Sequence, residues 1–283
     1  MANIQLKFSG IILTIGLIFV FSGVQAQDAR QLNFALFEAA REGENTQVLE
    51  LLEQGASVHA RNRFGNTALL FAARSNHIDT LKLLEEKGAD IDKANLNNQT
   101  PLFEAGARGN LDIARYLITR GAEVNVRNLK NISILSTAAF HNQVEVVRLL
   151  AEHDVETEVV DNSGKTPLIY AAANGNTEII DILIAGGADI NKQHGNQLSP
   201  LMWASGYGHL DAVKLLIKSG ADPDLVDNRG RTALMMAAQG GYKKTAKFLL
   251  NSGANANAKD NNGQSALMLA SAAGNEQIVK LLQ

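Results

Sequence analysis

The sequence contains no cysteine, which excludes disulfides, thiol nucleophiles, cysteine-ligated zinc and lipid anchors on cysteine. Aromatic residues make up only 5% of the chain and proline occurs four times. Neither sign of charge dominates, since the net charge is -3, so the composition indicates neither nucleic acid nor an anionic membrane as a partner. The apolar fraction of 46% and the charged fraction of 19% are typical of a globular protein.

The first 26 residues have the pattern of a secretory signal peptide. Lys7 precedes an apolar run over residues 8–21, and Val24 and Ala26 occupy the third-last and last positions before the expected cleavage point. As a helix the run is about 21 Å long, shorter than a bilayer core of about 30 Å. We predict a signal peptide over residues 1–26 and a mature chain over residues 27–283. An uncleaved membrane anchor is the alternative. The predicted destination is the periplasm in a Gram-negative source, and otherwise the exterior or a secretory lumen.

The rest of the chain repeats itself every 33 residues. The recurring segments are TALLFAA (67), TPLFEAG (100), SILSTAA (133), TPLIYAA (166), SPLMWAS (199), TALMMAA (232) and SALMLAS (265), with a degenerate copy, FALFEAA, at 34. One turn residue keeps the same step, at Gly43, Asn76, Gly109, Asn142, Gly175, Gly208, Gly241 and Gly274. Such a fixed period without insertions is the signature of a repeat architecture.

Each repeat predicts two helices. A Thr or Ser caps the first helix, Pro follows it in three copies, and the turn Gly or Asn ends it. A second helix with apolar residues at helical spacing follows, as in LDIARYLITRG, and ends at a Gly-Ala pair in most copies. The next segment is rich in Asn, Asp and Gly and predicts a turn or hairpin.

This pattern of T-P-L-x-x-A-A, turn glycine, V-x-L-L helix and G-A-D-x-N resembles the ankyrin repeat family. The resemblance implies an all-α ankyrin-repeat solenoid over residues 27–283. It would have about eight helix–turn–helix repeats joined by short β-hairpins or turns. The repeats would start near residues 34, 67, 100, 133, 166, 199, 232 and 265.

Two departures from the family pattern stand out. The family's histidine after T-P-L is replaced throughout, which predicts apolar packing in place of its hydrogen bonds; the residues are Leu70, Phe103, Ser136, Ile169, Met202, Met235 and Met268. In the fourth repeat, His153-Asp154 is taken to stand where other repeats have Gly-Ala, and Asp adopts left-handed geometry at some cost. We therefore expect residues 130–160 to be the softest internal region.

No constellation of residues predicts an enzyme, a cofactor or a metal site. His77 and His209 occupy one position, four repeats apart, and are interpreted as structural. Gly206-Tyr207-Gly208 does not follow a strand, so a phosphate-binding loop is not predicted.

The resemblance implies a partner-binding concave face formed by first helices and loops. With the capping Thr or Ser as position one, positions five, eight and nine share one side of the first helix. Large amphipathic residues collect there in repeats four to seven: Phe140, His141, Tyr170, Trp203, Tyr207 and Met236. Aromatic residues are enriched at binding hot spots. The alternative is that these side chains fill space between repeats.

Basic residues are also frequent on the same expected face. Arg74 and Arg108 lie on first helices, while the loops carry Arg61, Arg63, Arg127, Lys130, Lys165, Arg229, Arg231 and Lys259. Since the chain is acidic overall, this predicts a protein partner with an acidic surface patch. The alternative is a scattered set of solvated charges. We expect no nucleic-acid partner, no stable membrane insertion after cleavage, and a monomer.

The leading hypothesis is an exported, non-enzymatic scaffold that binds a protein through the concave face. The chain resembles exported bacterial ankyrin proteins, a group associated with periplasmic catalase or with restraint of peptidoglycan-processing enzymes. That resemblance implies a role in modulating or protecting a periplasmic enzyme. The alternative is a secreted ankyrin effector that acts on a host or neighbouring cell. A hydrolase or metal enzyme and a purely structural spacer are the remaining classes.

Overall fold

The computed structural model describes residues 28–283, which divide into two units, residues 28–96 and residues 97–283. The predicted signal peptide lies outside the described residues. Regular structure within residues 28–283 is helical, and residues 28–42 form the first helical stretch. The loops expected as turns or hairpins are turns, two of which carry an isolated β-bridge, Arg127 with Ser133 and His194 with Leu198.

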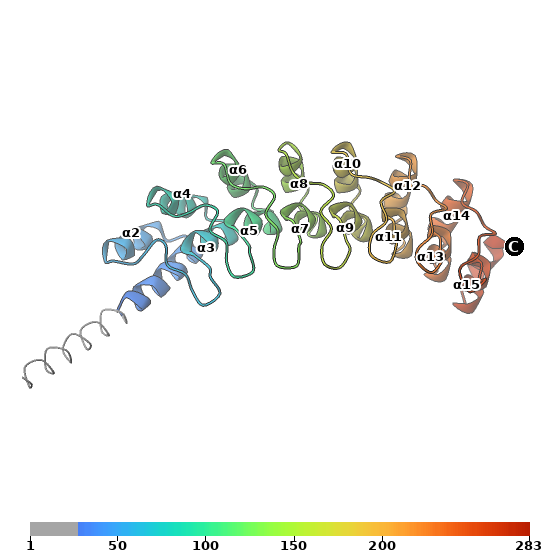
Figure 1. Cartoon of the computed structure of the whole chain (residues 1–283), viewed down its shortest axis with the longest axis horizontal. Coiled ribbons are helices and arrows are strands. Elements are labelled where there is room, and N and C mark those ends of the chain that lie inside the picture. The colour runs from blue at the N-terminus through green and yellow to red at the C-terminus, as the bar shows by residue number, and fades with distance from the viewer. Residues whose placement is uncertain (1–27) are drawn as a thin grey trace, which may run out of the picture. The chain divides into compact units, whose positions relative to one another are not determined.

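The described repeats contain two short helices each. The first helices are α3 (Ala68–Arg74), α5 (Pro101–Arg108), α7 (Ile134–Phe140), α9 (Pro167–Asn174), α11 (Pro200–Gly206), α13 (Ala233–Gln239) and α15 (Ala266–Ala272). The second helices are α2 (Asn45–Glu53), α4 (Ile78–Glu86), α6 (Leu111–Thr119), α8 (Val144–Ala151), α10 (Thr177–Ala185), α12 (Leu210–Lys218), α14 (Lys243–Asn251) and α16 (Glu276–Leu282). Within residues 97–283, first helices pack on first helices and second on second, giving two rows (Figure 1).

The predicted helix boundaries are confirmed. In each first helix from α3 to α15, the capping hydroxyl accepts a hydrogen bond from the backbone N–H three residues on, and proline opens α5, α9 and α11. All eight predicted turn residues adopt positive φ, between 57° at Asn142 and 78° at Gly43 and Gly241. Glycine reaches this region without a Cβ penalty, and Asn tolerates it better than most residues.

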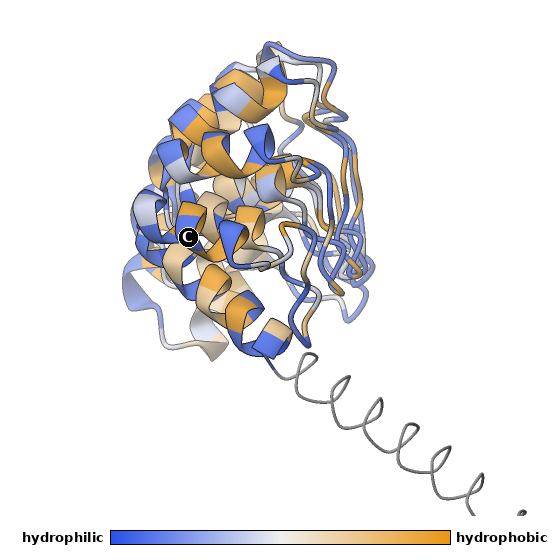
Figure 2. Cartoon of the chain, turned by 90° about the vertical axis from the view of Figure 1, so that its left-hand side faces the viewer, coloured by the Kyte–Doolittle hydropathy of each residue, from blue (hydrophilic) through white to orange (hydrophobic). Residues whose placement is uncertain are grey.

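Small and apolar side chains make up the core between the two rows. At the position of the family's histidine, Leu70, Phe103, Ile169, Met202 and Met235 are at most 1% exposed, as expected. Ser136 is also buried there, but it is polar and pairs with the hydroxyl of Ser133 at 3.1 Å. Met268, in the last repeat, is 53% exposed. Figure 2 shows the hydrophobic residues concentrated in the helices and hydrophilic residues along the loops.

A side-chain oxygen organises most of the loops. Asn or Asp accepts backbone hydrogen bonds from the residues two and four positions later; the recorded cases are Asn62, Asn128, Asp161, Asp227 and Asp260. His194 takes the same place in its repeat and makes no such bonds. That loop is closed by the bridge to Leu198, and Gln197 has a φ of 61°.

The fourth repeat differs where its second helix ends. The 33-residue step places Asp154 and Val155, not His153 and Asp154, at the positions of Gly121 and Ala122. Asp154 does not adopt the left-handed geometry expected of it, whereas Gly121 does, with a φ of 87°. The N–H of Val155 therefore donates to His153 O at 2.5 Å, while Ala122 donates five residues back, to Leu117 O.

We predict that the amide of Val155 exchanges hydrogen about tenfold faster than the amides of Ala122 and Ala188, because it lacks their bond to the preceding helix. The variant Asp154→Gly should restore protection at residue 155, since glycine reaches the left-handed region freely. Hydrogen exchange measured by NMR checks this, with Asp154→Ala as the control that should not restore it. Equal protection at the three amides of the wild-type protein would contradict it.

Candidate functional site

Four aromatic side chains of the second unit lie along its first helices. We call Phe140 on α7, Tyr170 on α9, Trp203 on α11 and Tyr207 after α11 the aromatic row. The rings of Phe140 and Tyr170 meet edge to face, with centroids 5.5 Å apart, and Trp203 stacks on Tyr207 at 5.9 Å. Phe140 is 49% exposed and Tyr207 is 54% exposed. Both pairs therefore present ring surface to solvent.

Lys165 joins the two pairs of the aromatic row. Its ammonium nitrogen lies 5.3 Å from the ring centroid of Tyr170 and 5.1 Å from that of Trp203, over both rings. Such contacts attract a cation to the negative face of an aromatic ring. Among the described residues, no carboxylate forms an ion pair with Lys165. The ammonium group is therefore positioned by the two rings, and it can still form an ion pair with an acidic group of a partner.

The loop that precedes α9 holds the hydroxyl group of Tyr170 in place. Its hydroxyl donates a hydrogen bond to the buried carboxylate of Asp161. Burial and this bond raise the pKa of Tyr170 to about 12. Burial opposes ionisation of Asp161, but hydrogen bonds from Tyr170, Lys165 and Ser163 outweigh it, so the pKa of that carboxyl is lowered. Tyr170 is half-buried and thus has a structural hydrogen bond in addition to its ring contacts with Phe140 and Lys165.

A cleft of about 410 Å³ opens beside the Trp203–Tyr207 stack, and we call it the Trp203 cleft. Its walls include Trp203 and Tyr207 on one side and Met236 and Gln239 of α13 on the other, with Gly206 among its lining residues. Trp203 and Met236 are half-buried, whereas Tyr207 and Gln239 are exposed. The volume is within the range of small binding sites.

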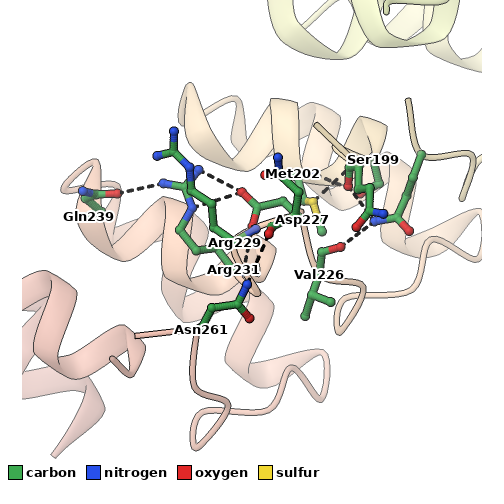
Figure 3. A network of polar contacts seen from close by, with 11 residues as sticks. Ser199, Met202, Val226, Asp227, Arg229, Arg231, Gln239 and Asn261 are labelled. Atoms are coloured by element: carbon green, nitrogen blue, oxygen red, sulfur yellow. Dashed lines mark hydrogen bonds and ion pairs between the residues drawn. The ribbon is translucent and has the colours of Figure 1, made fainter. Parts of the chain in front are cut away.

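Arg231 contributes its stem to the Trp203 cleft, but its charge is compensated. Its guanidinium donates to the buried carboxylate of Asp227 from Nε at 3.0 Å and from Nη2 at 2.9 Å. Nη1 also reaches Gln239 Oε1 at 3.5 Å, so that Arg231 lies between Asp227 and Gln239 (Figure 3). Both of these bonds end on Asp227 Oδ2, and together they hold the guanidinium in place. We therefore interpret Arg231 as a wall of the cleft rather than as a free cation.

The other residues expected at the site are distributed as follows. His141 is exposed and packs its ring edge to face against Phe140 at 5.0 Å, at the end of the aromatic row. Arg229 is exposed beside Asp227 (Figure 3). Arg108 lies 3.6 Å from the buried carboxylate of Glu104 on its own helix. Arg74 belongs to the first unit, where its guanidinium lies over the ring of Phe71.

Several loop cations predicted to form a basic face are committed to contacts within the chain. Arg61 donates to the backbone oxygens of Gly65 and Ala94, and Arg127 pairs with Glu156. Sequence reasoning could not foresee these pairings, because the acceptors lie in the loop itself or in the next repeat. It also did not select Gly206 as part of a site, although the sequence shows that this position lacks a side chain.

Within residues 28–283 no group of three His, Asp or Glu residues is placed to hold a metal ion. Nor does any helix of that part of the chain have the length and apolar character needed to cross a membrane. His209 Nε2 donates a hydrogen bond to Ala173 O at 2.9 Å, and a Cβ on Gly43 would lie 2.5 Å from the ring of His77. Both histidines thus cover the turn of the preceding repeat, as expected of structural residues.

Comparison with protein families matches the chain to ankyrin repeats, described as three copies, over residues 36–128, 125–194 and 196–283. The chain belongs to the ankyrin repeat family. Ankyrin repeats suggest a protein–protein interaction scaffold, imply protein partners and are typically non-enzymatic. No curated protein matches the chain. In this ankyrin repeat protein the aromatic row and the Trp203 cleft are the features on which a proposal of partner binding can be based.

We predict that Tyr170→Phe lowers the free energy of unfolding by about 1 kcal/mol at neutral pH, since it removes a hydrogen bond to a carboxylate. The pKa of Asp161 is lower in the folded state, so the stability that it contributes is present above about pH 4 and is lost as the pH falls through its folded pKa. The difference in the free energy of unfolding between the variant and wild type should therefore decrease as the pH is lowered below about 4. Urea unfolding at several pH values measures it.

Tyr207→Phe is the matched control, because no hydrogen bond of the Tyr207 hydroxyl is recorded in the described part of the chain. It should leave the unfolding midpoint unchanged. An equal midpoint for Tyr170→Phe and wild type at neutral pH would show that the bond to Asp161 adds no stability.

Proposed function

We propose that this ankyrin repeat protein is an exported, non-enzymatic scaffold that binds one partner protein through the aromatic row and the Trp203 cleft. The observation that carries the proposal is the stacked Trp203–Tyr207 pair, half-exposed beside a cleft of about 410 Å³. Trp and Tyr supply large, rigid contact area at low entropic cost and dominate binding hot spots. A structural spacer would have no need of exposed stacked rings.

Charge supports a partner with an acidic patch. The first helices α7, α9, α11, α13 and α15 contain no charged residue. The carboxylates of Asp161, Asp227 and Asp260 are buried in their loops, whereas Arg229 and Lys259 are exposed. In the loop segments around Asp161, Asp227 and Asp260 the exposed charge is therefore basic, whereas the exposed acids Glu156, Glu158, Asp222 and Asp224 lie earlier in the same loops. Such complementarity steers association and favours acidic partners.

Export rests on the sequence of residues 1–26, with Lys7, the apolar run over residues 8–21 and the small residue Ala26. We propose the periplasm as the working compartment, where the scaffold would modulate or protect an enzyme. Secretion as an effector toward a host or neighbouring cell is the alternative. In either compartment the absence of cysteine avoids mispaired disulfides.

Fractionation of cells that produce the full-length chain tests the compartment. We predict a mature protein that begins at Gln27, identified by mass spectrometry of its N-terminus, in the periplasmic fraction. Recovery from the culture medium would favour the effector role. An uncleaved chain that remains with the membranes would contradict the proposal of a signal peptide.

We predict that the double variant Trp203→Ala, Tyr207→Ala loses its partner in affinity capture from an envelope extract. Truncation of a hot-spot aromatic costs about 2 kcal/mol or more, which is about 30-fold in Kd. Phe64→Ala, which removes a ring that is 55% exposed in the first unit, is the matched control and should capture the partner normally. Equal recovery of the same partners by both variants and wild type would reject the proposed surface.

A further inference from the structure

Gly206 is an unusual residue for its place in the repeat. Position eight of the other first helices holds a residue with a side chain: Arg74, Ala107, Phe140, Ala173, Gln239 and Ala272. A glycine in the middle of a helix costs about 0.5–1 kcal/mol relative to alanine, and the cost is smaller at the C-terminal end, where Gly206 is the last residue of α11. The helix α11 thus ends in a residue without a side chain at the edge of the Trp203 cleft.

The packing around Gly206 does not require a glycine. A Cβ at this position would lie 3.8 Å from Cβ and 3.9 Å from Sδ of Met236, which is ordinary van der Waals contact. Gly240, across the cleft, is different, because a Cβ there would lie 2.4 Å from the ring of Tyr242. The fold therefore explains Gly240 but not Gly206. What Gly206 does provide is open space between Tyr207 and Met236.

The lining of that space defines its occupant. Trp203, Leu198 and Met236 offer apolar surface, and the cleft residues include no acid. Gln239 has its carbonyl oxygen toward Arg231, which leaves its amide N–H groups able to donate to a peptide carbonyl. A cleft of about 410 Å³ that is open to solvent suits one large side chain and its adjacent backbone.

The charges around the cleft define what flanks this side chain. Lys165 lies over the Trp203 ring without a carboxylate partner among the described residues, and Arg229 is exposed in the next loop. Both can pair with an acidic residue of an incoming chain, whereas Arg231 is already paired with Asp227. Lys165 thus offers a positive charge beside Trp203, and Arg229 offers one from the loop that also supplies Arg231 to the cleft.

We infer that the Trp203 cleft receives one large apolar side chain from an acidic segment of the partner protein, and that Gly206 keeps the cleft open for it. This inference rests on the proposed function and adds the chemistry of the bound segment. Lys165 and Arg229 bind carboxylates of this segment, and Gln239 hydrogen-bonds its backbone.

The test uses a library of random twelve-residue peptides displayed on phage and selected on the mature chain, residues 27–283. Selected peptides are then synthesised and titrated while tryptophan emission is recorded. Because Trp203 is the only tryptophan of the chain, its emission reports directly on occupation of the cleft. We expect peptides with one large apolar residue among Asp and Glu, and a saturable change in the emission of Trp203.

Variants that fill the cleft separate it from the rest of the aromatic row. Gly206→Leu should weaken the selected peptides at least tenfold and Gly206→Ala about threefold, because each occupies space while leaving Trp203 and Tyr207 in place. Ala272→Leu, which adds the same side chain at position eight two repeats away, is the matched control. Thermal unfolding establishes that each variant is folded. If Gly206→Leu does not fold, the comparison of Gly206→Ala with wild type is the test.

The charge part has its own variants. Lys165→Gln should weaken the same peptides about threefold, as expected of an exposed ion pair. Lys247→Gln, an exposed lysine on the second helix α14, should not affect them.

Three results would overturn the inference: no selected peptide, selected peptides that lack acidic residues, or peptides that bind wild type and Gly206→Leu equally well. The proposed function can hold even if this inference about the cleft fails. A partner captured from the envelope extract that depends on Trp203 and Tyr207 but not on Gly206 would keep the proposed surface and reject the cleft.

Discussion

Close packing of very small side chains between successive first helices is the constraint on which the rest of the structure depends. In the second unit these helices bury pairs such as Ala138-Ala139, Ala171-Ala172 and Ala237-Ala238 without measurable exposure. Alanine has no flexible atoms that could absorb a shift, so neighbouring helices approach in one register only. A period of 33 residues without insertions is the consequence in the sequence. The same register carries the exposed positions of each helix to equivalent places along the row.

This register explains why much of the fold could be predicted. The caps, the proline positions and the left-handed turn residues are local requirements, which the residue type itself reveals. The errors arose where one repeat departs from its sisters. Asp154 was expected to imitate glycine, but the chain avoided the left-handed geometry, because its Cβ makes that geometry costly. His194 was not singled out, although it replaces the loop's organising Asn or Asp.

The candidate site was predictable in position and less so in its interactions. Positions five and nine place Trp203 and Tyr207 on one side of a helix whatever their identity, and the structure stacks them. The engagement of Tyr170 by Asp161, and of Arg231 by Asp227, depends on how each loop folds back on the following helix. Periodicity within helices carries no information on those loop contacts. For this reason fewer basic side chains are available on the expected basic face than the sequence predicts, since Arg61, Arg127 and Arg231 have partners within the chain.

Buried and solvent-accessible positions of this repeat protein differ in which residues they can accept, and this difference helps to identify a functional site. Buried positions are restricted by the neighbouring repeats, so their residues report on stacking. Positions eight and nine of the first helices are half-buried or exposed and are less restricted in this way, so unusual residues there need another explanation. Gly206 is such a residue, because the Cβ of an alanine would fit there in ordinary van der Waals contact with Met236. The structural argument for a binding site is strongest where a residue costs stability and packing does not require it.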